Sequence, residues 1–432
     1  MHHRSNHVAF VIFALLTITA SASAQRKNAA SNADWYQFRG PTAMGVATGT
    51  LPTQFSSEQG IRWKVPLPGA GASSPIVFGD HIYVTSYAGY HVPGENDGEL
   101  ADLTRHLLAL DRRSGKTVWD QTIPAKQPEE SSIRDHGYAA NSPVADKDAV
   151  YVFFGKSGVF AFDHDGKQKW HSDVGDGTSG WGTAASPIIY QDLLIVNASV
   201  ESESLVGLDR KTGKERWRAK KIQESWNTPI IGANSGGQPE LLVARHGDVI
   251  AFDPATGNPR WTCKTQIEWY MVPTGVVADG VAYYLGGRSG TAALAVRLGG
   301  KDDVTRSHRI WTSPTGTNVP SPIYHDKHLY WVSDNKGIVY CAKADTGKLV
   351  YEQRLERPDQ VYASPIIAGN NIYYITRGGQ IYVIAAEPKF RQIASSSLRD
   401  GGSFDASPAV DGNQLLVRSD KFLYCIEGTP IK

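Results

Sequence analysis

The stretch that decides the fold is Gly207-Leu208-Asp209-Arg210-Lys211-Thr212-Gly213-Lys214-Glu215-Arg216-Trp217. Its pattern predicts the end of one β-strand, a tight turn, and a second strand that ends at a tryptophan. Asp209 can accept hydrogen bonds from N–H groups of its own turn, and Gly213 can adopt the positive φ that the turn requires. Close copies of the stretch recur along the chain, which indicates a repeat architecture.

The copies of this hairpin end in an aromatic residue. The same offsets join Asp111, Gly115 and Trp119, and join Asp253, Gly257 and Trp261; the copy Asp163, Gly166 and Trp170 is one residue shorter, and Cys341 to Tyr351 ends in tyrosine. A large ring wedged between units buries much apolar area, and its loss costs roughly 3–5 kcal/mol. We therefore expect these side chains to dock neighbouring units: Trp63, Trp119, Trp170, Trp217, Trp261 and Tyr351.

A second marker is Ser-Pro or Thr-Pro followed by two apolar strands joined by a Gly, Asp or Asn turn. It occurs at Ser74-Pro75, Ser142-Pro143, Ser186-Pro187, Thr228-Pro229, Ser321-Pro322, Ser364-Pro365 and Ser407-Pro408, with a degenerate copy at Pro273-Thr274. Together with the hairpin, each marker defines a unit of four strands. Units of this length and strand number are typical of β-propeller blades.

The two ends of the repeat array complement each other. The last unit, from Ser407 to Glu427, contains only three strands, and residues 61–67 look like a fourth strand without its earlier partners. Joining them closes the ring without a free edge, whereas an open solenoid needs capping units. The sequence thus predicts an all-β, eight-bladed β-propeller of four-stranded antiparallel blades over residues 61–427, closed by the N-terminal strand.

The N-terminal residues predict export. Residues 1–24 combine a partly basic start, an apolar run too short to span a bilayer, and a cleavage site after Ala24, so we expect a periplasmic or secreted protein without a membrane anchor. Residues 25–60 are expected to be a leader and a segment laid over the surface, and residues 428–432 a tail. The net charge of +1 gives no reason to expect nucleic-acid binding. The three scattered cysteines, Cys263, Cys341 and Cys425, are expected to be buried free thiols.

With its Asp-x-x-Thr/Ser-Gly-x-x-x-Trp turns and Ser-Pro strand starts, the repeat resembles the pyrroloquinoline quinone (PQQ) repeat family. That family includes eight-bladed quinoprotein alcohol dehydrogenases and the cofactor-free propeller of the outer-membrane barrel-assembly machinery. The adjacent cysteine pair of the dehydrogenases is absent here. Glu201 is the nearest candidate for their calcium ligand, but its context differs and we expect a solvated loop carboxylate. The resemblance therefore favours the cofactor-free branch, and PQQ with Ca²⁺ is expected only if the chain is a divergent dehydrogenase.

Chain direction places two sets of loops on one face of such a ring. These are the loops leading into each Ser-Pro strand and the loops between the second and third strands. They carry the candidate ligand-binding residues His136, Tyr138, Trp181, Glu201, Trp226, Arg245, Arg288, Tyr362, Arg377, Asp405 and Arg418. Two long insertions, at residues 87–105 and 124–138, fall on the same face and should form a partial lid. Ordinary channel filling and solvated loop tips would explain single residues, but aromatic residues and arginines gathered at one mouth are typical of binding sites.

Three functions remain open from the sequence. The first is a non-catalytic scaffold that binds an extracytoplasmic protein or a small anionic or sugar ligand, with no catalytic residue and no metal. The second is a divergent PQQ-dependent oxidoreductase. The third is a carbohydrate-binding or carbohydrate-cleaving propeller, suggested by the tryptophans, although cleavage needs two suitably spaced carboxylates.

Overall fold

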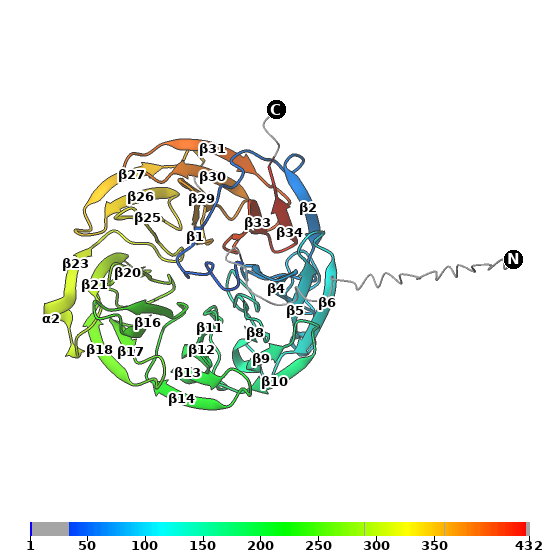
Figure 1. The fold of residues 1–432 in the computed structure, drawn as a ribbon, viewed down its shortest axis with the longest axis horizontal. Helices are drawn as coiled ribbons and strands as arrows, with labels where there is room; N and C mark the ends of the chain where they lie inside the picture. Colours follow the sequence, from blue (N-terminus) through cyan, green and yellow to red (C-terminus); the bar gives the residue numbers. More distant parts are fainter. Residues whose placement is uncertain (2–33, 289, 358, 429–432) are drawn as a thin grey trace.

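The structure is a computed structural model that describes residue 1 and residues 34–288, 290–357 and 359–428. The expected signal sequence and its cleavage site fall almost entirely on residues 2–33 and so lie outside the described residues, as do residues 429–432. Eight antiparallel blades surround one axis, which confirms the predicted eight-bladed propeller (Figure 1).

The first four blades take their strands consecutively from the chain. Blade 1 is β3 (Ile76–Phe78), β4 (His81–Ala88), β5 (Thr104–Asp111) and β6 (Thr117–Pro124); blade 2 is β7 (Val144–Ala145), β8 (Val150–Phe153), β9 (Val159–Phe162) and β10 (Gln168–Ser172). Blade 3 is β11 (Ile188–Tyr190), β12 (Leu193–Ala198), β13 (Ser204–Asp209) and β14 (Glu215–Lys220); blade 4 is β15 (Ile230–Ala233), β16 (Pro239–Arg245), β17 (Asp248–Phe252) and β18 (Pro259–Lys264). Short helical turns lie in three of the connections: η1 (Leu100–Asp102), η2 (Gly155–Ser157) and α1 (Ser199–Ser202).

The remaining blades repeat the pattern with two added strands. Blade 5 is β19 (Val276–Ala278), β20 (Val281–Gly286), β21 (Ala292–Arg297) and β23 (Arg309–Ser313); blade 6 is β24 (Ile323–His325), β25 (His328–Val332), β26 (Ile338–Lys343) and β27 (Leu349–Arg354). Blade 7 is β28 (Ile366–Ala368), β29 (Asn371–Ile375), β30 (Gln380–Ala385) and β31 (Gln392–Ser397). β22 (Asp302–Asp303) pairs in parallel with β18, and α2 (Thr305–His308) follows it.

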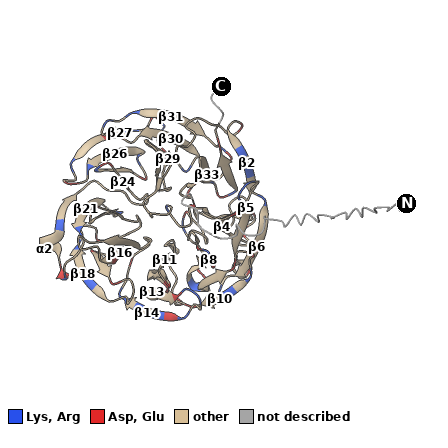
Figure 2. Ribbon diagram, viewed as in Figure 1, with Lys and Arg blue, Asp and Glu red and all other residues tan. Residues whose placement is uncertain are grey.

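Blade 8 closes the ring with strands from both ends of the chain. It contains β32 (Ala409–Asp411), β33 (Gln414–Arg418) and β34 (Phe422–Ile426), and its outer strand is β2 (Ile61–Pro66), which pairs antiparallel with β34. The predicted closure by the N-terminal strand is therefore correct. Charged residues of both signs are dispersed around the ring, in keeping with the small net charge (Figure 2).

The Ser-Pro markers form a belt of hydrogen bonds around the axis. The backbone N–H of Ser74 donates to Oγ of Ser142 in the next blade at 2.9 Å. Equivalent bonds of 2.9–3.1 Å continue through Ser186, Thr228, Thr274, Ser321, Ser364 and Ser407. In the degenerate marker, Thr274 takes the place of the usual serine. The hydroxyl is thus repeated because it satisfies a buried backbone donor of the preceding blade.

The repeated aromatic residue and the repeated turn glycine meet across neighbouring blades. The ring of Trp217 covers Gly257 so closely that a Cβ there would lie 2.4 Å from it. The same contact joins Trp63 to Gly115, Trp119 to Gly166, Trp170 to Gly213 and Trp311 to Gly347. Sequence reasoning missed Trp311, because β22 and α2 lengthen the connection between β21 and β23 in blade 5.

Trp261 and Tyr351 make different contacts. Trp261 donates its indole N–H to Glu240 at 2.8 Å, and the same carboxylate accepts the N–H of Gly299 from blade 5 at 3.1 Å. Tyr351 of blade 6 packs edge-on against Phe390 of blade 7, with ring centroids 5.9 Å apart. Both side chains therefore link neighbouring blades, but not through a turn glycine.

Residues 34–60, which we call the strap, cross the centre of the ring (Figure 1). The strap was expected to lie on the surface, yet its Trp35 and Arg39 are only 2% and 1% exposed. β1 (Val46–Ala47) pairs in parallel with the inner strand β28 of blade 7. Part of the strap is buried because its backbone pairs with the inner edges of blades 1, 2 and 7. Backbone pairing of this kind leaves no periodic pattern in the sequence.

Candidate binding site at the channel mouth

The axis of the propeller holds a channel with an open mouth. The channel encloses about 880 Å³ of empty space, counting the mouth, and all eight belt residues line it. Phe38 of the strap lines the channel as well. Since the strap crosses the face away from the leading loops, Phe38 forms the far end of the channel, and a ligand would enter from the face that carries the two insertions.

One residue from each blade lines the channel two positions before the belt residue. These residues are Ala72, Ala140, Ala184, Trp226, Val272, Val319, Tyr362 and Asp405. Six of the blades contribute a small or medium apolar side chain or Trp226, whereas Tyr362 and Asp405 of blades 7 and 8 are polar. The mouth is therefore asymmetric, with an apolar side and a polar side.

The apolar side carries an aromatic cluster formed by Trp181, Trp226, Trp269 and Tyr270. The ring of Tyr270 lies centrally, with centroid distances of 5.1 Å to Trp181, 5.4 Å to Trp226 and 5.2 Å to Trp269. Tyr270 has a φ of 69°, which is uncommon for a bulky residue. The loops leading into blades 3, 4 and 5 thus converge on one aromatic surface.

Two guanidinium groups cover this cluster. The guanidinium carbon of Arg288 lies 4.5 Å from the Trp181 ring centroid, and that of Arg134 lies 4.9 Å from it. Among the residues that the structure describes, neither group has a carboxylate within ion-pairing distance, and both side chains are exposed. Two stacked cations without an internal counter-ion favour an anionic group on whatever binds at the mouth.

The polar side of the mouth is an ion-pair network around Arg377. Its Nε lies 2.6 Å from Oδ1 of Asp405, and its terminal nitrogens lie 3.2 Å from Oδ2 of Asp405 and 3.4 Å from Asp135. Arg377 also stacks over Tyr362 at 4.4 Å. Burial raises the pKa of Asp405, and the adjacent Arg377 opposes that shift.

The second insertion bridges the mouth between these two sides. Arg134 stacks on Trp181 in blade 3, while the next residue, Asp135, contacts Arg377 and the hydroxyl of Tyr362 in blade 7. His136 holds the backbone of the insertion to Trp181, with its Nε2 2.9 Å from the Trp181 carbonyl oxygen. Residues 134–136 therefore span part of the opening, as expected for a partial lid.

The structure brings seven of the predicted site residues to the mouth: His136, Trp181, Trp226, Arg288, Tyr362, Arg377 and Asp405. Four others lie elsewhere. Arg245 ends β16 and pairs with Asp248 at 3.2 Å. Arg418 is fully buried and donates hydrogen bonds to the carbonyl oxygen and the hydroxyl of Ser73. Trp269, Tyr270 and Arg134 also lie at the mouth but were not among the predicted site residues.

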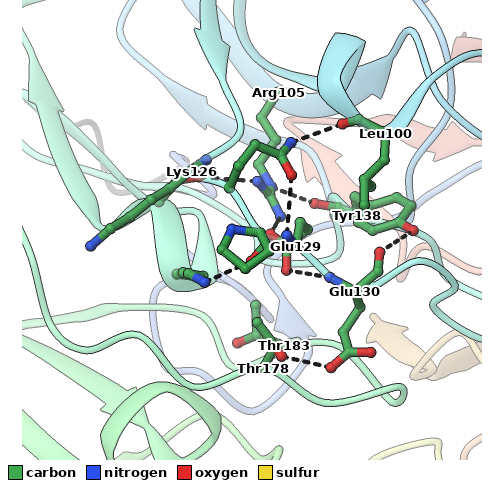
Figure 3. A network of polar contacts seen from close by, with 12 residues as sticks. Leu100, Arg105, Lys126, Glu129, Glu130, Tyr138, Thr178 and Thr183 are labelled. Carbon is green, nitrogen blue, oxygen red and sulfur yellow. Dashed lines mark hydrogen bonds and ion pairs between the residues drawn. The ribbon is translucent and has the colours of Figure 1, made fainter.

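Tyr138 and Glu201 belong to a second, separate cavity of about 310 Å³ beside the insertions. Arg105 and Glu129 form a buried ion pair there at 2.6 Å, and Arg105 also donates to the carbonyl oxygen of Tyr138 at 3.0 Å (Figure 3). Figure 3 also shows Thr178 bonded to Glu130, which joins the insertion to blade 3. This network anchors the base of the lid.

The expectation that Glu201 is a solvated loop carboxylate is wrong. Glu201 is 5% exposed, one of its carboxylate oxygens has no hydrogen-bond partner in the described structure, and α1 turns it inward towards Thr183. Burial raises its pKa to about 8, and the nearby Glu129 adds to the shift. A carboxyl group of this kind is protonated near neutral pH.

The residues present do not fit the quinone and calcium pair of the dehydrogenases. Glu201 lies outside the channel lining, in a cavity that it shares with the cationic side chains of Arg105 and Lys156. Within the described ranges, no three His, Cys, Asp or Glu side chains are grouped to hold a metal ion. A hard divalent cation needs several oxygen ligands, and these side chains do not supply them together.

The fold and mouth define an eight-bladed propeller with a lidded, one-ended channel, and the comparisons agree with the propeller fold. A family model described as "Outer membrane protein assembly factor BamB" matches residues 88–237 and 245–418. The chain belongs to this PQQ-repeat family. Among the described residues, no helix is long and apolar enough to cross a membrane.

Similar proteins are found in both branches of the wider fold. Outer membrane protein assembly factor BamB from Burkholderia pseudomallei is 22% identical over 72% of this chain and 83% of its own length, and the Yersinia pestis protein is 22% identical over 65% and 80%. The crystal structure of BamB from Moraxella catarrhalis has a TM-score of 0.60 at 15% identity, covering 84% of this chain and 98% of that one. A quinohemoprotein alcohol dehydrogenase from Comamonas testosteroni has a TM-score of 0.66 at 12% identity, covering 92% and 81%. At these identities, the two solved structures show the fold alone.

Proposed function

We propose that this protein is an exported, non-catalytic propeller that binds an extracytoplasmic partner protein through the face that carries the two insertions. The main support for this proposal is the aromatic cluster at the channel mouth, which Arg134 and Arg288 cover. Neither arginine has a carboxylate counter-ion in the described structure. Aromatic and arginine side chains in a concave site are the usual anchors of protein interfaces. The curated relatives, named as assembly factors, support a scaffold role.

The polar groups of the channel argue against catalysis. Asp135 and Asp405 both pair with the same guanidinium, that of Arg377. The two ring nitrogens of His136 each lie 2.9 Å from a backbone carbonyl oxygen. General acid–base catalysis needs a titratable group free to exchange a proton with the substrate, and these groups are already engaged.

A carbohydrate ligand is the second candidate, and the aromatic cluster is the observation that favours it. Trp181 and Trp269 are half-buried, so part of each ring faces the mouth. Trp226 is a poorer platform, because it is 8% exposed and its indole N–H donates to the carbonyl oxygen of Gly182. A sugar acid would combine ring stacking with the two guanidinium groups.

Site-specific photo-crosslinking in the native extracytoplasmic compartment tests the proposal. A photoreactive amino acid at Trp269 should capture a discrete protein, and the same group at Val118, which is exposed on the outer strand β6, should not. Capture at Trp269 should fall at least tenfold in the Arg288→Glu variant but persist in Arg288→Lys. The proposal would be contradicted by equal capture at both positions, or by capture at Trp269 that is unchanged in the Arg288→Glu variant.

The alternatives give different outcomes in two binding assays. Binding to acidic glycans on an array, lost in Trp181→Ala, would replace the protein partner with a carbohydrate ligand. Added PQQ and Ca²⁺ should leave the thermal unfolding temperature unchanged, since a bound ligand would raise it. A thermal shift together with turnover of alcohols would restore the oxidoreductase hypothesis.

A further inference from the structure

Within the described ranges, the strap pairs with the inner edges of some blades and leaves those of blades 3, 4 and 5 without a backbone partner. In blades 1, 2 and 7, the residue three positions after the belt residue donates its backbone N–H to a strap carbonyl oxygen. Val77 donates to Trp35 at 2.9 Å, Ala145 to Tyr36 at 2.9 Å, and Ile367 to Gly45 at 2.8 Å. These three donors lie in buried residues, with 0%, 1% and 1% exposure.

The equivalent residues of blades 3, 4 and 5 are Ile189, Ile231 and Val277. Val77 pairs with Ile82, one step before the pair that closes its hairpin. Ile189 and Val277 hold the same place in their own hairpins. Ile231 lies opposite Leu241 in a longer hairpin, in which Asn234 donates its N–H to Gln238, so the alternation again turns the Ile231 N–H away from β16. Because alternate N–H groups of an edge strand point away from its only partner, these donors face the axis. In the described structure, no strap carbonyl oxygen reaches them, and all three residues are half-exposed.

An apolar groove runs along these open edges. Two adjoining cavities, of about 1510 and 520 Å³ including solvent-open space, share the strap residues Thr42 and Ala43 and the blade residues Ile230 and Ile231. Ile189 lines the first cavity and Val277 the second. The strap thus forms one wall of a single groove, and the unpaired inner edges of β11, β15 and β19 form the other.

We propose that this groove binds an extended, apolar segment of a partner polypeptide, which pairs with the inner edges of β11, β15 and β19. The strap itself shows the binding mode, since β1 pairs in parallel with β28 through Val46 opposite Ile367. The strap residues that complete the covered edges are aromatic, aliphatic or glycine. The open edges of the groove present aliphatic side chains in the same way, while Gln37, Lys147 and Gln191 add polar groups to the first cavity. A segment that supplies carbonyl oxygens and apolar side chains continues the strap around the ring, by the strand-addition mode of peptide recognition.

This site is independent of the proposed function at the mouth, because it lies on the opposite face of the propeller. The strap separates the two, with Phe38 directed into the channel and Thr42 lining the groove. A protein could therefore hold one partner at each face. Loss of binding at one face leaves the other intact.

The test uses a phage-displayed library of random heptapeptides, panned on the purified mature protein. Enriched peptides should be rich in aromatic and β-branched residues. Hydrogen exchange should show that they protect the amides of Ile189, Ile231 and Val277, which exchange rapidly in the free protein. Peptides that leave these amides unprotected, or a library that yields no binder, would overturn the proposal.

Two pairs of variants separate groove binding from other effects. Ile231→Pro removes the inward donor while its ladder partners remain, and it should weaken peptide binding at least tenfold, whereas Ile231→Val should not. Thr42→Arg fills the groove from the exposed strap wall, away from the blade strands, and should weaken binding similarly, whereas Thr42→Ser should not. Unchanged binding in folded Thr42→Arg would contradict the proposal even if Ile231→Pro fails to fold.

Other occupants would be recognised in the same exchange experiment. Protection of the three amides that increases with protein concentration, together with a dimer in solution, would show that a second copy occupies the groove. Protection in the free monomer that disappears when residues 25–33 are deleted would show that the chain's own N-terminus occupies it. Either result would replace the partner polypeptide.

Discussion

The carboxylate of Asp135 lies 3.4 Å from the guanidinium of Arg377, although the two residues belong to opposite sides of the channel mouth. Asp135 sits in the insertion that leads into blade 2, and Arg377 follows β29 in blade 7. Asp135 also accepts a hydrogen bond from the hydroxyl of Tyr362 at 3.4 Å. This long-range contact joins the insertion to blade 7 across the mouth.

Asp135→Asn should loosen the lid without unfolding the propeller. The change removes a partly exposed charge pair, which contributes at most about 1 kcal/mol to the free energy of unfolding. Amide exchange over residues 124–138 should become faster, while exchange in the blade strands stays as it was. Asp97→Asn is the control, because Asp97 is an exposed acidic residue of the other insertion, 3.6 Å from His91. Unchanged exchange at residues 133–136 would mean that the Arg377 contact does not hold the lid.

Glu201 should make the stability of the protein depend on pH in an unusual range. Its pKa is about 8 in the folded protein, against an ordinary value of 4.5. Between these values the folded protein keeps a proton that the unfolded chain releases, so the free energy of unfolding decreases as pH rises from 4.5 to 8. At about 1.4 kcal/mol per pH unit, the full decrease is roughly 4–5 kcal/mol, and the stabilising contribution is complete only below pH 4.5.

Glu201→Gln should remove most of this pH dependence, because the amide is neutral at every pH and can still bond to Thr183. Denaturant unfolding at pH 5, 7 and 8.5 measures the effect. The free energy of unfolding of the variant should increase relative to that of the wild type as pH rises. Glu203→Gln is the matched control, since Glu203 is two residues away and exposed. Parallel pH profiles for Glu201→Gln and the wild type would show that Glu201 does not carry the raised pKa.

The sequence predicted those features that repeat and missed those that occur once. The Asp209-to-Trp217 hairpin and the Ser-Pro markers gave the number of blades, the chain direction and the closure by Ile61–Pro66. The chain direction through each blade was enough to place Trp181, Trp226 and Asp405 on one face of the ring. The offset of two residues before each belt hydroxyl would have identified one channel-lining residue from every blade.

The missed features depend on side-chain direction or on single contacts. Arg418 ends a second strand, and Glu201 follows one as Arg377 does. Yet Arg418 is buried at a blade interface, and Glu201 lies in α1, which turns it inward. Arg134 reaches Trp181 only because the insertion folds back across the mouth. The strap has no repeating sequence pattern. It is held by its backbone carbonyl groups, which every residue has, so its pairing with the blades leaves no signal in the sequence.

The contact between Trp217 and Gly257 gives a sharp test of how the blades are held together. Trp217→Ala should cost roughly 3–5 kcal/mol in the free energy of unfolding, since it leaves a cavity between blades 3 and 4. Gly257→Ala should also destabilise, because its φ is 70° and the new Cβ would lie 2.4 Å from the indole ring. In Trp217→Ala/Gly257→Ala the ring is gone, so only the backbone part of the glycine effect remains.

The double variant should therefore lose less stability than the sum of the two single variants, by more than about 0.5 kcal/mol, which is the usual limit for independent sites. Gly247→Ala measures the backbone part alone, because Gly247 has a φ of 74° and no atom within 4 Å of the position a Cβ would occupy. In the Trp217→Ala background, Gly257→Ala should cost about as much as Gly247→Ala does in the wild type. Additive single effects would mean that the ring and the glycine do not interact, and that blades 3 and 4 are joined by the belt hydrogen bond between Ser186 and Thr228 and by core packing instead.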